Sequence, residues 1–521
     1  MPFAVKAKSR GGEDDLEWTA RVGVAGPTAL EILQSQDIPI RSSCMGKGLC
    51  HQCRVKVEKG LAPISPSDRK AFREGALKEG WRLSCMLRPK ANLELFFPQV
   101  YVFQEDLQVL RSPQGPWWVA VDLGTTGVEL AAVDEQGLWA KVKSLNRQIQ
   151  MGADVMTRLE YAQRRGVEPL RQRAVGQLRS LVKVLERAQG SSSEFTGRIV
   201  VAGNSAVISF LLGLNIESLA VSPYQPEVLE AQVRELTPAA APVSASAASA
   251  AEPSAWQLET LPLIDSFVGG DLWAGLFLLH QRGLATAEHS WVLVDVGTNS
   301  EILFWDGQKL FVSSTPAGPA FEGSSISIGM RAESGAIVNP RWNLAHQRWD
   351  YEVIDEDYPK GLCGSSLVQM VAEAVTAGSV NREGEVLEPT HLELSQGLAL
   401  SQADVREFQL AKSAIRTGLE LVVEKVSATG KPPEKLFLGG AFGQHLPLQP
   451  CFDLDLLPLM EVEILGNSSL EGTVAWGQAT DQQRDQFNTW VEQTKTPIEL
   501  ALSDDFQEKF IRNMYLGQAP S

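Results

Sequence analysis

Apolar runs alternate with amphipathic stretches through most of the chain after residue 116. Short runs rich in β-branched and aromatic residues predict strands. The clearest are WVAVDL at 118–123, GVELAAV at 127–133, RIVVAG at 198–203, WVLVDVG at 291–297, EILFW at 301–305 and KLFLGGAFG at 435–443. Apolar residues at helical spacing predict helices at LRSLVKVLERA (178–188) and AKSAIRTGLELVVEKV (411–426). Such alternation of strands and helices is typical of an α/β layered fold.

Three zones divide the chain. Residues 1–98 contain most of the cysteines and end in NLELFFP, which predicts a strand stopped by Pro98. Residues 99–116 close with two prolines and a glycine, which predicts a linker. Residues 117–521 carry the α/β pattern, which is interrupted at 237–255 by a stretch rich in Ala, Ser and Pro. Because that composition cannot build a core, we expect a flexible surface loop there.

The composition bounds the class of protein. Of the 521 residues, 44% are apolar and 21% charged, as in ordinary globular proteins. No apolar run reaches the roughly 18 residues needed to cross a bilayer, and the N-terminus lacks the apolar core of a signal peptide. We therefore expect a cytoplasmic protein that does not enter a membrane. The formal net charge of −16 argues against binding to nucleic acid, which favours a basic surface.

Four of the six cysteines form one cluster in the sequence. They are Cys44, Cys50, Cys53 and Cys85, with the spacing Cys-x5-Cys-x2-Cys and then 31 residues before the fourth. Six cysteines are too few for a disulfide scaffold, and clustering in a cytosolic chain indicates metal. Thiolates suit iron–sulfur clusters, and Gly46 and Gly48 let the loop fold closely around sulfides. The pattern therefore predicts a [2Fe–2S] cluster on these four ligands.

A structural zinc site is the main alternative for these cysteines. Zinc sites are usually built from paired Cys-x2–4-Cys knuckles, and only Cys50 and Cys53 form one. His51 could suggest a Rieske centre, but four cysteines already suffice, and we expect an exposed loop residue. Cys363 and Cys451 stand alone in the sequence and are expected to be small buried hydrophobic residues.

The cysteine pattern resembles that of the plant- and adrenodoxin-type [2Fe–2S] ferredoxins, and the five-residue first gap matches the adrenodoxin variant. The neighbouring segments are similar as well: a helix-like PTALEILQSQ before the loop, a strand-like CRVKVEKG after it, and WRLSC at the fourth ligand. The resemblance covers residues 1–98 and implies a β-grasp fold. One departure is His51, which stands where glycine is usual.

Two Asp-x-Gly-Thr segments each follow an apolar run, one beginning at Asp122 and the other at Asp295. A strand that ends in Asp and leads into a Gly-rich hairpin offers backbone N–H groups to phosphate and a carboxylate to hydrated Mg²⁺. A third segment, LGGAFG at 438–443, has glycines where an adenosine can approach the backbone closely. Each segment alone could be an ordinary strand and turn. Together, and in this order, they indicate duplicated halves facing one nucleotide.

This zone resembles the ATP-binding superfamily of actin, Hsp70 chaperones and sugar or acetate kinases. The resemblance implies a duplicated ribonuclease-H-like fold that binds ATP and Mg²⁺. It assigns Asp122, Gly124, Thr125 and Thr126 to the first phosphate loop, Asp295, Gly297, Thr298 and Asn299 to the second, and Gly439, Gly440 and Gly443 to the adenosine loop. Segments 269–276 and 471–479 match the small-residue connecting helices. Asp295 and Asp271 are the catalytic candidates; Asp271 either orients the attacking water or caps a helix.

The whole chain resembles the ATP-dependent reductive activators of corrinoid proteins. The resemblance is carried by MGADVMTRLEYA (151–162), VAGNSAVISFLLGL (201–214), VDVGTNSEILF (294–304), AGPAFEGSSISIGMRAESGAI (317–337) and GLCGSSL (361–367). It implies an ATP-hydrolysing enzyme that reduces a corrinoid protein of a methyltransferase system from Co(II) to Co(I). It also implies an electron donor, which the sequence does not identify, and leaves a homodimer open. Activators of this kind often carry a middle domain, where this chain has only residues 99–116.

Three other functions fit the same residues. They are a small-molecule kinase whose ferredoxin domain senses redox state, an Hsp70- or actin-like assembly protein with a structural cluster, and an ATP-coupled electron donor to another low-potential metalloenzyme. A kinase would yield a phosphorylated product, and an assembly protein would polymerise or bind unfolded clients. The ATPase activity of a corrinoid activator would instead rise when a corrinoid protein is present.

Overall fold

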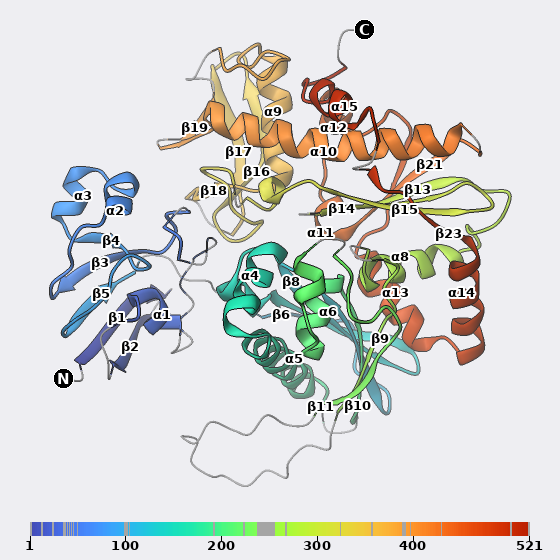
Figure 1. Cartoon of the computed structure of the whole chain (residues 1–521), viewed down its shortest axis with the longest axis horizontal. Helices are drawn as coiled ribbons and strands as arrows, with labels where there is room; N and C mark the ends of the chain where they lie inside the picture. The colour runs from blue at the N-terminus through green and yellow to red at the C-terminus, as the bar shows by residue number, and fades with distance from the viewer. Residues whose placement is uncertain are drawn as a thin grey trace.

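The computed structural model describes residues 3–11, 14–22, 26–34, 38, 40, 42, 44, 46–48, 50–97, 103, 105–190, 193–221, 224–236, 256–265, 268–297, 299–323, 325–355, 358–387, 392–395, 397–428, 430–500 and 503–518. Within them, a small N-terminal domain lies beside two larger α/β lobes (Figure 1). The expected surface loop at 237–255 lies outside the described residues. Among the described helices, none is both long and apolar enough to cross a membrane.

The N-terminal domain is built on a five-stranded sheet in the order β2–β1–β5–β3–β4. Its elements are β1 (Phe3–Gly11), β2 (Asp14–Val22), α1 (Ala29–Gln34), β3 (Arg54–Lys59), α2 (Pro66–Ala71), α3 (Glu74–Lys78), β4 (Trp81–Leu83) and β5 (Leu93–Phe96). The first and last strands, β1 and β5, pair in parallel; β2 and β3 flank them in antiparallel orientation, and β4 pairs antiparallel with β3. Alternate strand residues such as Val5, Ala7 and Leu95 enter one core with α1. This arrangement confirms the predicted β-grasp fold.

Part of the predicted linker belongs to the next sheet. Asp106–Val109 form β6, which pairs antiparallel with β9 (Gly137–Leu145). All four side chains of β6 are exposed, so no alternation of apolar residues marks this strand in the sequence. Backbone hydrogen bonds to the edge of β9 define it instead. The segment 99–116 is therefore an edge strand in its second half rather than a linker throughout.

An ion pair anchors the residues that follow β6. Arg111 Nη2 donates to Oδ1 of Asp134 at 2.5 Å, and the backbone N–H groups of Gln114 and Gln136 donate to the same carboxylate. The Asp134 side chain is buried, whereas Arg111 is partly exposed. The hydrogen bond from Arg111 is the main reason that the pKa of Asp134 is lowered to about 2.

Replacing Asp134 with asparagine is expected to lower the free energy of unfolding at pH 7 by about 1–2 kcal/mol, allowing for the partial exposure of Arg111. Because folding lowers the pKa of this carboxyl group, its stabilisation is complete above the ordinary aspartate pKa. The stabilisation is lost as the pH falls through about 4 to 2. Urea unfolding of both proteins at steps from pH 7 to pH 3 measures the difference. A difference that does not shrink toward pH 3 would contradict this account.

The two lobes repeat one five-stranded unit. The unit is β12–β10–β7–β8–β9 in the first lobe and β22–β21–β13–β14–β15 in the second. In each, three strands form an antiparallel meander, and two more join parallel to its first strand. These strands are β7 (Trp117–Leu123), β8 (Gly127–Asp134), β10 (Phe195–Ala202), β12 (Trp256–Thr260), β13 (Trp291–Val296), β14 (Asn299–Trp305), β15 (Leu310–Pro316), β21 (Lys435–Gly439) and β22 (Glu461–Ile464). The repeat confirms the predicted ribonuclease-H-like duplication.

Helices cover these sheets, and short strands extend them. The helices are η1 (Arg147–Met151), α4 (Val155–Arg165), α5 (Glu168–Ala188), α6 (Ser205–Leu212), α7 (Glu217–Ala220), α8 (Gly270–Gln281), η2 (Pro319–Glu322), α9 (Gly364–Thr376), α10 (Gln402–Ser427), α11 (Gly440–Gly443), α12 (Leu448–Asp453), α13 (Ser468–Gln478), α14 (Asp481–Thr494) and α15 (Phe506–Arg512). The strands at the far edges of the two large sheets are β11 (Val233–Leu236) and β23 (Lys495–Pro497). Two small separate sheets are formed by β16 (Ala336–Asn343), β17 (Arg348–Val353) and β18 (Gly361–Leu362), and by β19 (Glu393–Ser395) and β20 (Leu398–Ala399).

Helices α8 and α13 pack against each other where the two lobes meet (Figure 1). Small residues allow this close approach, since a Cβ at Gly472 would lie 2.0 Å from the carbonyl oxygen of Ala274. Both segments expected to be small-residue connecting helices are therefore helical. The predicted strand at 435–443 is shorter than expected: β21 ends at Gly439, and Gly440, with a φ of +77°, turns the chain into α11.

Candidate functional site

The structure brings Cys53 and Cys85 together from two neighbouring strands. Cys53 directly precedes β3, and Cys85 follows β4, which pairs with β3. The two buried side chains hydrogen-bond each other, and the N–H of Ser84 donates to the Cys53 carbonyl oxygen at 2.8 Å. Cys44 and Cys50 lie on the loop between α1 and β3 and are partly exposed. We name residues 44–53 the cysteine loop.

The cysteine loop is tightly curved, as its glycines predict. The backbone angle φ is +82° at Gly46, +74° at Gly48 and +55° at His51. Glycine adopts this left-handed region freely, whereas a residue such as His51 is disfavoured there by roughly 1–2 kcal/mol. A Cβ at Gly46 would lie 3.6 Å from the Cβ of Cys85, so the loop passes directly beside the fourth cysteine. His51 therefore stands where glycine is the less strained residue.

The four thiols fit an iron–sulfur cluster chemically. The hydrogen bond with Cys53, and then burial, raises the pKa of Cys85 well above its ordinary value, while the same bond lowers the pKa of Cys53. Charges on Cys44 and Cys50 raise the pKa of Cys85 further, so four thiolates repel one another here. Iron ions would offset that repulsion, and a [2Fe–2S] cluster takes four thiolates. Within the described residues, no three His, Cys, Asp or Glu side chains converge on a site for one metal ion.

Five carboxylates lie near one another where the two lobes face each other. Asp122 and Glu129 are cross-strand neighbours on β7 and β8, and Asp295 and Glu301 are the matching pair on β13 and β14. Asp271, the second residue of α8, interacts electrostatically with both aspartates. Each lobe therefore contributes one Asp–Glu pair, as a duplicated nucleotide site requires.

Ionisation of these carboxyl groups is unfavourable in this site. Burial is the main reason that the pKa is raised to about 7 for Asp122, about 6 for Asp271 and about 8 for Asp295. The charge of Asp271 adds to the increase in pKa at Asp122, Asp295 and Glu301. Clustered groups with raised pKa values are typical of functional sites. A hydrated divalent cation such as Mg²⁺ would offset the repulsion, so the residues present fit that ion.

The first aspartate is fixed by residues at the start of α13. Ser469 Oγ donates to Asp122 Oδ1 at 2.8 Å, and Asn467 Nδ2 donates to Asp122 at 3.1 Å and to Glu129 at 2.9 Å. These donors come from a helix more than 340 residues later in the chain. They hold the carboxylate in one orientation before any nucleotide is bound.

One segment donates hydrogen bonds to three successive carbonyl groups of the first phosphate loop. Asn146 Nδ2 donates to the carbonyl oxygen of Gly124 at 2.7 Å, and its backbone N–H donates to that of Thr126 at 2.8 Å. The buried Arg158 donates from Nη2 to the Thr125 carbonyl oxygen at 2.5 Å. The loop backbone is therefore fixed, which is the property that lets successive N–H groups bind a phosphate.

The two threonine hydroxyls of this loop bond to different partners. Asn204 Nδ2, at the start of α6, donates to Thr125 Oγ1 at 2.9 Å. Thr126 Oγ1 donates to Glu322 Oε2 of η2 at 2.7 Å. The second bond joins the first lobe to the second across the nucleotide site.

The second phosphate loop is described only in part. Its residues Gly297 and Asn299 are described, and Asn299 begins β14, but Thr298 between them lies outside the described residues. A Cβ at Gly297 would lie 3.2 Å from the Asn299 carbonyl oxygen, which indicates a tight turn.

The adenosine loop lies directly on the second aspartate. Gly439 is opposite Asp295 in the parallel pair β13–β21. A Cβ at Gly440 would lie 2.1 Å from Asp295 Oδ1, so a larger residue could not occupy this position. Gly443 ends α11 and packs against Leu438 of β21.

Asp271 lies in the first turn of α8, two residues after the N-cap Gly269, and belongs to the carboxylate group. Its Oδ1 accepts the N–H of Leu272 at 2.9 Å. The preceding Gly269 lies against the loop before α6, since a Cβ there would be 2.4 Å from the Cα of Asn204. Both expected roles are compatible with this position, and the catalytic one stays a prediction.

Eight of these residues are absent from the sequence predictions. Glu129 and Glu301 could have been found, because GVELAAV and NSEILF place a glutamate shortly after each Asp-x-Gly-Thr segment. The other six act through contacts between distant segments, so no local pattern identifies them; they are Asn146, Arg158, Asn204, Glu322, Asn467 and Ser469.

Three family models match the chain. The model described as the 2Fe-2S iron-sulfur cluster binding domain matches residues 13–90, the RACo middle region matches 117–281, and the C-terminal domain of RACo, the ASKHA domain, matches 289–520. The middle region therefore coincides with the first lobe. The sequence interpretation that a middle domain is missing from this chain was wrong, because the RACo middle region is present as the first lobe.

Similar proteins are found across most of the chain. The corrinoid activation enzyme RamQ of Eubacterium limosum is 27% identical over 434 residues, which is 77% of this chain and 70% of that protein. The [Co(II) methylated amine-specific corrinoid protein] reductase of Methanosarcina barkeri is 25% identical over 382 residues, 68% of each chain. A solved reductive activator for corrinoid, iron-sulfur protein has the same fold, with a TM-score of 0.64 and 20% identity over 99% of this chain and 98% of that one.

The fold and the two sites define a [2Fe–2S] ferredoxin domain joined to an ATP-hydrolysing ASKHA domain, a class that couples an electron carrier to nucleotide hydrolysis. Within that class, the chain contains the RACo middle region and the C-terminal domain of RACo, and it is homologous to the corrinoid activation enzyme RamQ.

Proposed function

We propose that this protein is an ATP-dependent one-electron reductase that returns the cobalt of a corrinoid protein from Co(II) to Co(I). One observation carries the proposal: a single chain folds a four-cysteine ferredoxin site beside a duplicated nucleotide site, in the domain order of the corrinoid activators. The similar proteins of Eubacterium limosum and Methanosarcina barkeri support the acceptor, since their names specify corrinoid activation and corrinoid protein reduction.

The energetics explain why an electron carrier needs ATP. When bound by the four cysteines, a plant-type cluster supplies single electrons at a potential near about −400 mV. Each further 100 mV that an acceptor demands costs about 2.3 kcal/mol per electron. Hydrolysis of ATP between two lobes that open and close can provide this free energy by changing the geometry around the acceptor.

We infer a role for each candidate residue. Asp122 and Asp295 would hold hydrated Mg²⁺, and the phosphate loops would bind the phosphates through backbone N–H groups and hydroxyls. The adenosine contacts the glycines at 439–443. Asp271 orients the attacking water, and its bond to the Leu272 N–H keeps the carboxylate aimed from the helix start.

The proposal names two partners. One is the corrinoid protein of a methyltransferase system, and the other is a low-potential electron donor that recharges the ferredoxin domain. We place the reaction in the cytoplasm, where thiols stay reduced. A homodimer is a further expectation, which light scattering of the purified protein tests.

The test is an anaerobic reduction assay with a corrinoid protein from the same genome. The reduced protein and Mg·ATP are expected to convert the Co(II) spectrum to that of Co(I), and omission of ATP should leave most of it as Co(II). The ATPase rate should rise when the corrinoid protein is added. If the corrinoid protein neither binds nor stimulates ATP hydrolysis, the acceptor is wrong. A phosphorylated small molecule would instead favour a kinase.

A further inference from the structure

One segment after the first phosphate loop contacts both functional halves of the molecule. It comprises Asn146, η1 and α4, and we name residues 146–165 the elbow. Through Asn146 and Arg158 it holds the carbonyl groups of the first phosphate loop. Figure 1 shows that α4 is also the helix of the first lobe nearest the N-terminal domain. The elbow includes MGADVMTRLEYA, of which only Arg158 belongs to the nucleotide site described above.

Three contacts join the elbow to the ferredoxin domain. They are the ion pair of Lys47 Nζ with Glu160 Oε2 at 2.5 Å, the ion pair of Arg165 Nη2 with Glu31 Oε1 at 2.8 Å, and the hydrogen bond from Gln34 Nε2 to the Gln150 carbonyl oxygen at 2.9 Å. Lys47 lies between the two left-handed glycines of the cysteine loop. The surface of the ferredoxin domain nearest its cysteines is therefore the surface that the elbow covers.

The elbow is a stiff connection between these contacts. Arg158 and Glu160 are two residues apart on one helix, so their side chains leave it in nearly opposite directions. A capping box between Asp154 and Thr157 fixes the start of α4. A Cβ at Gly152 would lie 2.7 Å from Thr157 Oγ1, so the turn into the helix is closely packed. A shift of the phosphate loop is thus transmitted to Glu160 by a single rigid element.

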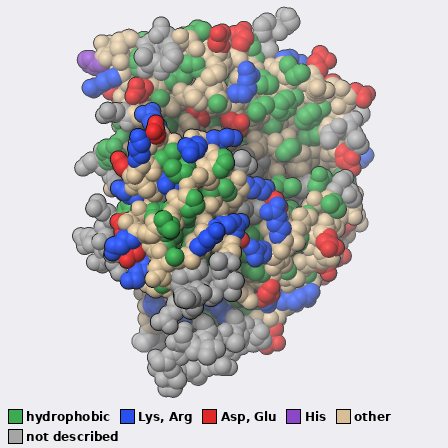
Figure 2. Space-filling model, turned by 60° about the vertical axis from the view of Figure 1, so that its left-hand side comes forward, with side chains coloured by type: hydrophobic (Ala, Val, Ile, Leu, Met, Phe, Trp, Pro, Cys, Tyr) green, Lys and Arg blue, Asp and Glu red, His purple; other side chains and the backbone are tan. Residues whose placement is uncertain are grey.

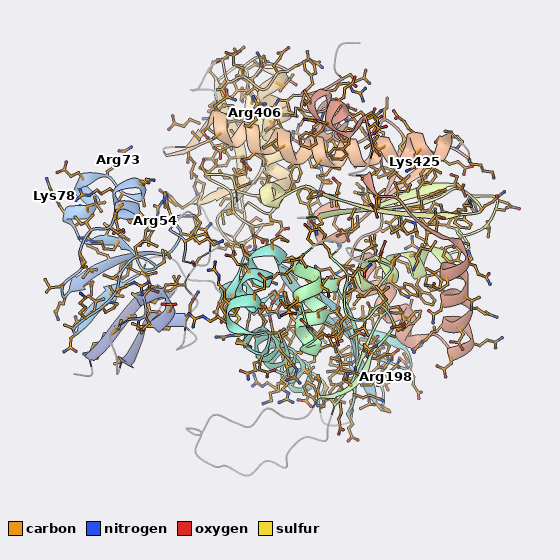
Figure 3. All side chains as sticks on the ribbon, in the orientation of Figure 1. Arg54, Arg73, Lys78, Arg198, Arg406 and Lys425 are labelled. Carbon is orange, nitrogen blue, oxygen red and sulfur yellow. The ribbon has the colours of Figure 1, made fainter. Side chains whose placement is uncertain are left out.

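The two parts of the chain differ in net charge. Residues 1–98 contain 16 Lys and Arg against 11 Asp and Glu, whereas residues 99–521 contain 31 against 52. Figure 2 shows Lys and Arg side chains gathered across the middle of the face on which the ferredoxin domain comes forward. In Figure 3, Arg54, the residue after Cys53, lies nearer to the lobes than Arg73 and Lys78 do. At the contact itself the ion pairs run in both directions, since Lys47 meets Glu160 whereas Glu31 meets Arg165.

We propose that the elbow couples nucleotide binding to docking of the ferredoxin domain. Without nucleotide, Glu160 holds the cysteine loop against α4 through Lys47, and Arg165 holds α1 there through Glu31. Phosphate bound at the first loop moves the elbow through Asn146 and Arg158 and releases the ferredoxin domain. This deepens the proposed function and rests on it, because the same loop must face a corrinoid protein for electron delivery. The cysteine loop cannot contact α4 and a partner protein at once. Because nucleotide favours the released state in this proposal, the nucleotide must bind the released state more tightly than the docked state.

The test is hydrogen exchange of the full-length protein with its cluster, measured under anaerobic conditions by mass spectrometry. The readout is the exchange rate of the amides of α1, the helix that carries Glu31 and Gln34. Glu160→Lys is expected to raise that rate about fivefold, because it replaces an ion pair by a like-charge contact. The double variant Lys47→Glu/Glu160→Lys should restore protection. Glu186→Lys, the same charge change at an exposed position of α5, is the matched control.

A non-hydrolysable ATP analogue is expected to raise the α1 exchange rate in the wild type by a similar factor. The coupling is wrong if the analogue leaves α1 exchange unchanged, whether or not corrinoid reduction occurs. The docking contact is wrong if Glu160→Lys behaves like Glu186→Lys. If corrinoid reduction fails while the analogue still releases α1, the proposed function fails and the coupling stands.

Discussion

Replacing Asp295 with asparagine is expected to reduce ATP hydrolysis by at least about 10²-fold, the scale on which loss of one electrostatic group slows catalysis. Asp295 is the next-to-last residue of β13, lies opposite Gly439 and is covered by Gly440, so its carboxylate has one fixed place in the proposed nucleotide site. Asparagine keeps the size of the side chain but removes the negative charge that offsets Mg²⁺. Phosphate release measured with saturating Mg·ATP gives the rate.

Two controls separate this effect from misfolding. The visible spectrum of the cluster should be unchanged, since its cysteines lie in another domain. Thermal stability without nucleotide should be at or above that of the wild type, because burial and neighbouring charges raise the pKa of Asp295 and its ionised form disfavours folding. Asp485→Asn, at an exposed position of α14, is the matched substitution. Full ATPase activity in Asp295→Asn would remove the assigned role.

Asp271→Ala then decides between the two roles of that residue. If Asp271 orients water, kcat should fall while the KM for ATP changes little. If it only caps α8, the variant should lose about 1 kcal/mol of stability and keep its turnover.

The sequence predicted the fold where local patterns repeat. The two Asp-x-Gly-Thr segments each begin near the end of a strand and lead into the same meander, so the duplication is visible without a structure. The strand β6 was missed because its side chains are all exposed and only backbone pairing with β9 defines it. The periodicity of apolar residues indicates which side chains are buried, and an exposed edge strand has no buried side chains.

The sequence predicted the loops of the site but not the residues from other segments that contact those loops. Asp122 and Asp295 stand at the ends of apolar runs, where a phosphate site is expected. Arg158 is different: it lies on an amphipathic helix, and its contact with the Thr125 carbonyl oxygen joins residues 33 apart. Likewise, Glu322 reaches Thr126 across 196 residues. Such contacts follow from how the lobes pack, which no single segment encodes.

The cysteine prediction has the second large expected effect. Cys53→Ser should abolish the visible absorption of the cluster and lower the iron content from about two per chain to near zero. Cys53 is buried, hydrogen-bonds Cys85 and directly precedes β3, so no neighbouring side chain can replace its thiolate. A serine hydroxyl keeps the shape of the site but is a much poorer ligand for iron than a thiolate.

The matched control is Cys451→Ser, since Cys451 is equally buried but lies in the second lobe on α12. Burial raises the pKa of Cys451 to about 12, as expected for an inert core thiol. This variant should keep its iron, its spectrum and its ATP-dependent corrinoid reduction, although a buried hydroxyl can cost about 1–3 kcal/mol of stability. Cys53→Ser should keep nucleotide binding but lose corrinoid reduction, because the two sites lie in separate domains. A wild-type protein that contains zinc and no visible chromophore would contradict the assignment of all four ligands.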